Sequence, residues 1–121
     1  MSDASQLYRW IDRPSEIILG GVSRRFITSE HIMIGQVILR CGDVVPEHAH
    51  PNEQFTFVVE GAMHFWLSDN TNGVIVRAGE VIVIPSGIIH RAVVLEDTLE
   101  YDIFNPPRTD WMDAEASLLR T

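Results

Sequence analysis

The sequence predicts an all-β protein whose strands close into a barrel. Short apolar runs rich in valine, isoleucine and phenylalanine alternate with breaks of glycine, proline, asparagine and aspartate. Many short strands at regular spacing are typical of β-sandwiches and β-barrels, and closure into a barrel leaves no exposed sheet edge. The expected strands are Ile17–Leu19, Phe26–Ile27, Ile32–Leu39, Phe55–Val59, Met63–Leu67, Val74–Val76, Val81–Ile84, Ile88–Leu95 and Leu99–Phe104.

The two ends of the chain depart from this strand pattern. Residues 1–15 are polar and contain Pro14, so we expect an irregular arm there. Residues 109–119 are expected to form a short C-terminal helix, because Thr109 or Asp110 can cap it and acidic residues lie near its N-terminus. A chain of 121 residues is large enough for one hydrophobic core, so we expect a single domain over residues 1–121.

Composition and charge limit the partners. The net charge is −8 and the sequence has no clustered basic patch, which argues against nucleic-acid binding. No apolar run approaches the length of a membrane span, so we expect no membrane partner. The single cysteine, Cys41, and an opening that lacks a basic start followed by an apolar run lead us to expect a cytoplasmic protein. A small anionic substrate remains compatible with the acidic chain, because a metal ion and one or two arginines reverse the sign of charge inside a pocket.

The strongest functional signal is a set of histidines with the spacing of metal ligands. His48 and His50 alternate, so on a strand their side chains project from one face. Gln54 shares that face if the strand is regular, whereas Glu53 becomes the alternative ligand if a bulge follows Pro51. A third histidine has to come from elsewhere in the fold, and His90 is the candidate.

These ligands predict one divalent transition metal, which we expect to be zinc, nickel, manganese or iron. Three imidazoles and an amide are all neutral, so they leave the ion its full double charge. That charge favours Lewis-acid action on a bound hydroxyl, carbonyl or carboxylate.

The same residues lie in two motifs that resemble those of the cupin family. The first motif is matched by Gly42, His48, His50, Gln54 and Gly61, with glutamine in the place of the usual glutamate. The second is matched by Gly79, Pro85, Gly87 and His90, with Val94 where asparagine is usual. The resemblance implies a double-stranded β-helix barrel of the jelly-roll type. It does not imply one activity, because cupins include isomerases, lyases, dioxygenases and non-enzymatic binders.

A narrower resemblance rests on His48-Ala49-His50-Pro51-Asn52-Glu53-Gln54 and on the stretch from Tyr101 to Trp111. Both look like the small pectin-degradation cupins that ketonise 4,5-unsaturated uronates. The resemblance implies metal binding by three histidines and a glutamine, and a pocket lined by Asp102, Phe104 and Arg108. Asp102 would then move the proton as general acid and base, and Arg108 would bind the substrate carboxylate.

Other interpretations of these residues stay open at this point. Asp102 is equally consistent with a salt-bridged strand carboxylate, and Arg108 with an ion pair that pins the Pro106-Pro107 turn. Gln36 is a further candidate for the lining of the cavity.

Three functions therefore compete. The first is a metal-dependent enzyme that ketonises an unsaturated uronate or a similar enolisable sugar acid. The second is an iron-dependent dioxygenase, and the third is a non-catalytic module that binds a small metabolite. We also expect a homodimer, for which the apolar Ile17–Leu19 region offers an edge strand.

Overall fold

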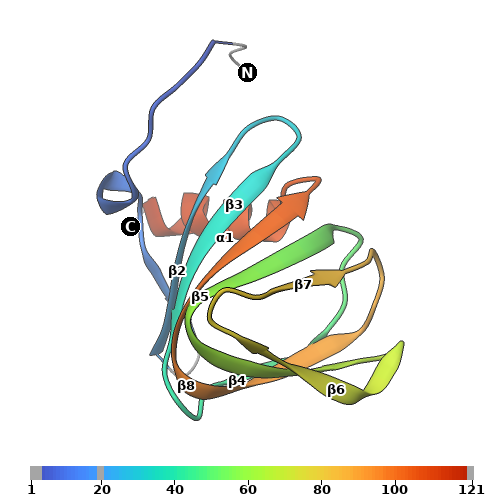
Figure 1. The fold of residues 1–121 in the computed structure, drawn as a ribbon. Helices are drawn as coiled ribbons and strands as arrows, with labels where there is room; N and C mark the ends of the chain where they lie inside the picture. Colours follow the sequence, from blue (N-terminus) through green and yellow to red (C-terminus); the bar gives the residue numbers. More distant parts are fainter. Residues whose placement is uncertain (1–3, 19–20, 120–121) are drawn as a thin grey trace.

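The computed structural model describes residues 4–18 and 21–119, and its strands form a single antiparallel sheet that curls into a barrel (Figure 1). The elements are the 3-10 turn η1 (Trp10–Asp12), the strands β1 (Glu16–Ile18), β2 (Val22–Thr28), β3 (Met33–Leu39), β4 (Val44–His48), β5 (Glu53–Leu67), β6 (Asn70–Arg77), β7 (Val81–Ile84) and β8 (His90–Asn105), and the helix α1 (Thr109–Leu119). The expected all-β barrel with a short C-terminal helix is confirmed.

Two long strands organise the barrel. The main path of the sheet runs β1-β2-β3-β8-β5-β6, while β4 pairs with β8 and β7 pairs with β5. β5 and β8 are 15 and 16 residues long and pair with each other from Glu53↔Asn105 to Leu67↔His90. Each of them also takes a further partner on its other edge at both ends, and this arrangement wraps the sheet around one interior.

The expected strands differ from the observed ones where a strand bends without ending. The runs at 55–59 and 63–67 belong to β5, because Gly61 forms a bulge in the middle of one strand and does not end it. Its φ is +95°, and a Cβ there would collide with the backbone of Asp97 and Thr98. Likewise, the runs at 88–95 and 99–104 belong to β8, and the expected break at 69–73 falls largely within β6.

The sequence pattern missed β4. Its polar residues and Pro46 are not typical of a strand, and Pro46 has no backbone N–H to donate to a neighbouring strand. Accordingly, the pairing of β4 with β8 is irregular, with a register shift between Val45 and His48. Leu19, part of the expected first strand, lies outside the described residues.

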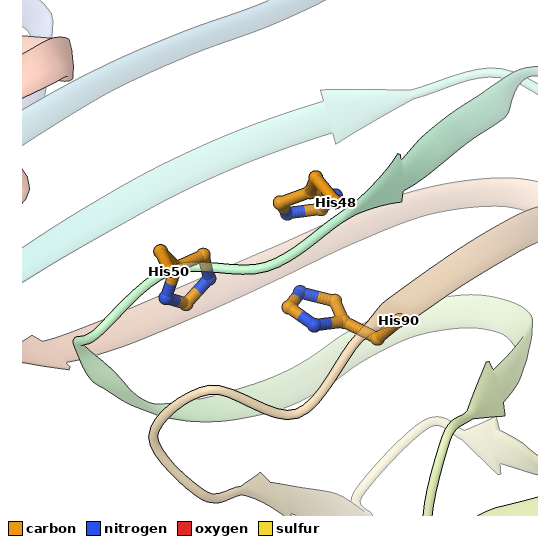
Figure 2. Close-up of side chains that lie close together, drawn as sticks. All are labelled: His48, His50 and His90. Carbon is orange, nitrogen blue, oxygen red and sulfur yellow. The ribbon is translucent and has the colours of Figure 1, made fainter.

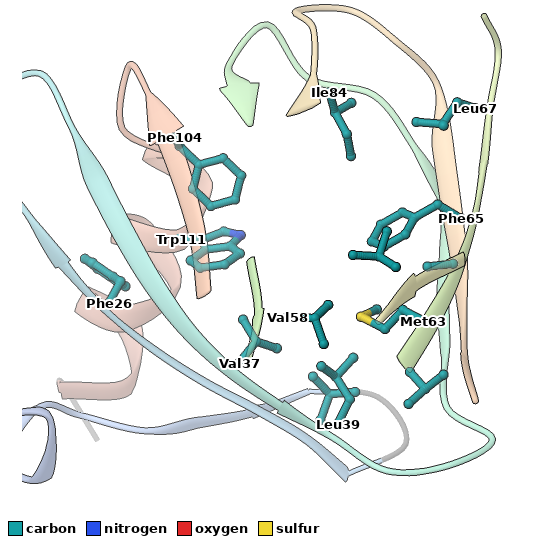
Figure 3. Packing of buried hydrophobic residues seen from close by; sticks show 14 of the residues in the cluster. Phe26, Val37, Leu39, Val58, Met63, Phe65, Leu67, Ile84, Phe104 and Trp111 are labelled. Carbon is teal, nitrogen blue, oxygen red and sulfur yellow. The ribbon is translucent and has the colours of Figure 1, made fainter. Parts of the chain in front are cut away.

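The interior holds both apolar and polar buried side chains. Val37, Leu39, Met63 and Phe65 are among the buried apolar side chains (Figure 3). α1 contributes Trp111, whose ring packs edge-on against Phe104 at a centroid distance of 5.0 Å.

The outer face of β5, β7 and β8 carries exposed apolar side chains that we call the outer patch: Phe55, Phe57, Val81, Val83 and Ile103. The strand register brings them together, because Phe55 is opposite both Val83 and Ile103, and Phe57 is opposite Val81. Among the described residues, no helix is both long enough and apolar enough to cross a membrane.

Candidate metal centre

His48, His50 and His90 meet at one point of the barrel interior (Figure 2). Each offers a ring nitrogen, and these atoms lie within 4.8 Å of one another. His48 ends β4 and is directly opposite His90, the first residue of β8. His50 follows in the loop before β5, so the three side chains come from two segments that are 40 residues apart in the sequence.

A backbone hydrogen bond holds the two segments in register. The N–H of Gly87 donates to the carbonyl oxygen of His50 over 3.0 Å. Gly87 has a φ of +80°, a left-handed conformation that glycine adopts without steric cost. The glycine of the second motif therefore positions a histidine of the first.

All three imidazoles present the same nitrogen to the cluster. In each, Nδ1 lies 2.8–3.0 Å from a backbone carbonyl oxygen two residues away. A carbonyl oxygen only accepts, so Nδ1 carries the proton and Nε2 presents its lone pair. The carbonyl partners of His48, His50 and His90 are those of Pro46, Asn52 and Ile88. Such bonds orient metal-binding histidines and fix their tautomer.

Burial keeps the rings of His50 and His90 neutral. Burial lowers the pKa of His90 to about 4 and also lowers the pKa of His50, so both remain unprotonated at neutral pH. Among the described residues, Nε2 of His90 is buried without a hydrogen-bond partner. An unpartnered buried lone pair is costly unless something binds it.

Gln54 completes the set. Its amide nitrogen donates to the hydroxyl of Thr56 over 2.8 Å, which turns its Oε1 toward His50 Nε2 at 3.0 Å. With Nδ1 of His50 protonated, both of these facing atoms are acceptors, and a cation between them would satisfy both. The donor set thus fits one metal ion. Glu53, the alternative ligand, is exposed, because β5 begins at this residue and alternation turns it outward.

A cavity of about 330 Å³ extends from the histidines into the barrel. The expected residues Asp102, Phe104 and Arg108 all line it. The lining residues that sequence reasoning missed include Arg24, Glu100 and Trp111. Strand alternation could have found Glu100, since it shares a face of β8 with Asp102 and Phe104.

Asp102 is a buried carboxyl tied to the metal ligands by hydrogen bonds. The Thr56 hydroxyl donates to its Oδ1 over 2.7 Å, while the same hydroxyl accepts from the Gln54 amide. Burial raises the pKa of Asp102 to about 6, against the lowering effects of this hydrogen bond and of the charges on Arg108 and Arg24. Asp102 therefore changes protonation near neutral pH.

Two arginines of the cavity lining lie close to aromatic rings. The guanidinium of Arg108 lies 5.2 Å from the Phe104 ring centre and that of Arg24 lies 4.4 Å from the Trp111 ring centre. Arg108 also donates two hydrogen bonds to Asp110, at 2.7 and 2.9 Å. The ion pair considered from the sequence thus exists, but it joins Arg108 to the first turn of α1.

The structure corrects the expectation that Gln36 lines the cavity. This side chain lies outside the lining, and its amide bonds to Tyr101 and Arg25, in each case over 3.0 Å. Gln36 is paired with Tyr101 across β3 and β8, and cross-strand partners share a face, which here is the outer one.

A family model described as "Cupin domain" matches residues 35–101, which is more than half of the chain and includes the three histidines. The chain belongs to the cupin family. This cupin matches the solved structure of KdgF from Halomonas sp. with a TM-score of 0.81 and 26% identity, covering 89% of this chain and 99% of that one. It matches an RmlC-like cupin from Shewanella frigidimarina with a TM-score of 0.80 and 25% identity, covering 89% and 96%.

A shorter sequence match is to a dioxygenase. Over 55 residues the cupin is 38% identical to an acireductone dioxygenase of Puccinia graminis f. sp. tritici. The match covers 42% of this chain and 30% of the dioxygenase, so the chain corresponds to less than a third of that relative.

Proposed function

We propose that this cupin is a metal-dependent enzyme that ketonises an unsaturated uronate or a similar enolisable sugar acid. One observation carries the proposal. A buried carboxyl that titrates near neutral pH shares a cavity with the histidine cluster and is tied to it through Thr56 and Gln54. The resemblance of the 48–54 and 101–111 stretches to the pectin-degradation cupins and the structural similarity to KdgF support the choice of substrate.

His48, His50, His90 and Gln54 would hold the metal ion. When bound, it would supply Lewis-acid polarisation of substrate oxygens without changing oxidation state. Neutral ligands suit this chemistry, because they leave the ion its charge.

The arginines bind and orient the substrate. Arg108 offers a planar fork that matches a carboxylate, and only 12% of its side chain is exposed. Substrate binding has to compete with Asp110 for this guanidinium. Arg24, which is paired with Glu16 at 2.9 Å, adds a second guanidinium beside Trp111. An anion at this end of the cavity would compete with Glu16 for Arg24 as it does with Asp110 for Arg108.

Asp102 moves the proton. As a carboxylate it accepts the proton of an enol hydroxyl, and its pKa near 6 makes it ionised yet sufficiently basic at neutral pH. The Thr56 hydroxyl holds the carboxylate in place by donating to Oδ1.

The test is to mix metal-loaded protein with 4,5-unsaturated galacturonate and to follow the loss of the absorbance of its double bond. The wild-type chain is expected to accelerate this loss, and Asp102→Ala is expected to abolish turnover while retaining the metal. Turnover of Asp102→Ala at the wild-type rate would contradict the role of Asp102.

The match to the acireductone dioxygenase favours a second candidate, an iron-dependent dioxygenase. Iron-loaded protein in an oxygen electrode distinguishes the two functions. Oxygen uptake with enolic substrates would support the dioxygenase, and flat traces across such substrates would eliminate it. If the protein binds the uronate unchanged and consumes no oxygen, the non-catalytic binding module becomes the best account.

We also propose that two copies associate through the outer patch. A symmetric dimer places the same surface on both partners, and the uncharged side chains of the patch suit such self-association. The edge strand β1, from which a dimer was expected, has three residues within the part of the chain that the structure describes.

A further inference from the structure

The cavity holds a second buried carboxyl, Glu100, which the mechanism above does not use. Glu100 and Asp102 stand two residues apart on the inward face of β8, and both line the cavity. They are 4% and 6% exposed, and their carboxyl groups hydrogen-bond to each other. Such a pair holds one proton between its members, because ionising both would place two like charges in a dry site.

The surroundings place this proton on Glu100. The cross-strand partners of Glu100 are Val37 on β3 and Val58 on β5, which are apolar. Its Oε2 is buried without a hydrogen-bond partner among the described residues. Burial, followed by the neighbouring charge of Asp102, raises the pKa of Glu100 well above its usual range.

The surroundings of Asp102 favour the charged form by comparison. Its cross-strand partners are Gly35 on β3 and Thr56 on β5, and Thr56 donates a hydrogen bond to it. The positive charges that act on Asp102 are those of Arg108, which precedes α1, and Arg24 on β2. At neutral pH, therefore, Asp102 is the base and Glu100 is the acid.

We propose that Glu100 is a catalytic residue that delivers a proton to the substrate carbon while Asp102 removes the enol proton. This inference rests on the proposed function. In the ring-opened enol form of the sugar acid, the O–H bond of the enol breaks, and Asp102 takes its proton. The electrons of that bond form the new C=O, and the electrons of the C=C form a C–H bond with the proton of Glu100.

The pair then resets itself. After the reaction, Asp102 is protonated and Glu100 is ionised, and the hydrogen bond between them carries the proton back. No net proton is gained or lost and no other reactant is consumed, as an isomerisation requires. A single carboxyl would have to turn between oxygen and carbon to make both transfers, whereas two fixed carboxyls do not.

The test compares metal-loaded Glu100→Gln with wild type on 4,5-unsaturated galacturonate. Glutamine keeps the size and the hydrogen bonding of the protonated carboxyl but has no acidic proton. We expect kcat to fall by about 100-fold or more, the usual contribution of general acid catalysis, with KM and bound metal almost unchanged. Glu96→Gln, on an exposed part of the same strand, is the matched control and should keep wild-type kcat. An unchanged kcat in Glu100→Gln would overturn the proposal.

Two further measurements do not depend on turnover. Infrared spectra of the metal-loaded chain at pH 7 should show a protonated-carboxyl band that Glu100→Gln lacks, and absence of this band from wild type would overturn the proposal.

In the unfolded chain Glu100 releases its proton at a lower pH than in the folded chain. As the pH rises above the usual titration range of glutamate, the free energy of unfolding should therefore fall more steeply in wild type than in Glu100→Gln. Equal slopes would also overturn the proposal. If wild type fails to ketonise but the band and the slopes behave as expected, the proposed substrate is wrong and the carboxyl pair stands.

Discussion

On β5, Gln54 and Thr56 face the barrel interior and are 6% and 0% exposed, whereas Phe55 and Phe57 face outward and are 40% and 38% exposed. β8 shows the same pattern, with a polar residue inside and an apolar residue outside, because buried Asp102 is next to exposed Ile103. In an ordinary sheet of this kind the apolar residues face the core and the polar ones face solvent. Burying an unsatisfied polar group costs about 1–3 kcal/mol, and among the described residues the inner face leaves Nε2 of His90 and Oε2 of Glu100 buried without a hydrogen-bond partner. We propose that the inner face serves catalysis and the outer face serves association.

The largest effect is expected when the inner face loses its metal ligands. His48→Ala/His50→Ala removes two nitrogens of the cluster and should lower metal affinity by at least about 100-fold, which exceeds the usual loss from one outer-shell partner. Metal content after purification, measured by elemental mass spectrometry, checks this. His31→Ala is the control, because the side chain of His31 is 82% exposed and lies outside the cluster. Equal metal in wild type and the double variant would show that the cluster is not the metal site.

An intermediate effect is expected at the rim of the cavity. Arg108→Ala removes a charged hydrogen-bond donor worth about 1.5–3 kcal/mol, so KM for the uronate should rise roughly 10- to 100-fold. Arg91→Ala is a matched control, since Arg91 lies outside the cavity lining and stacks on Trp66. Steady-state kinetics separate KM from kcat. If both variants change KM equally, Arg108 does not bind the carboxylate.

The smallest effect on turnover is expected on the outer face. Phe57→Ser should weaken the dimer by about tenfold or more, equivalent to roughly 1.4 kcal/mol, and leave kcat within about twofold. Sedimentation velocity across a concentration series measures this. Leu7→Ser removes an exposed apolar side chain from the N-terminal arm, outside the outer patch, and should leave association unchanged. A wild-type chain that stays monomeric at all concentrations would refute the dimer.

The sequence was sufficient to predict the barrel and the histidine cluster, because strand period and motif spacing are local properties. Whether another side chain points into the barrel or outward depends on the register between strands that are distant in the sequence. Gln36 was misjudged for this reason, since only its pairing with Tyr101 reveals that it faces outward. Arg24 and Trp111 come from opposite ends of the chain and meet only once β2 and α1 are in place. Glu100 was within reach of the sequence, because it shares the period-two face of Asp102.

The most direct test of the account is to remove all metal from the wild-type chain with a chelator and add one divalent metal back in steps, measuring uronate ketonisation at each step. We expect no turnover without metal, a linear rise up to one metal per chain, and no increase beyond it. Ketonisation that persists unchanged after the metal is removed would contradict the account, because the histidine cluster and the carboxyls would then not form one site.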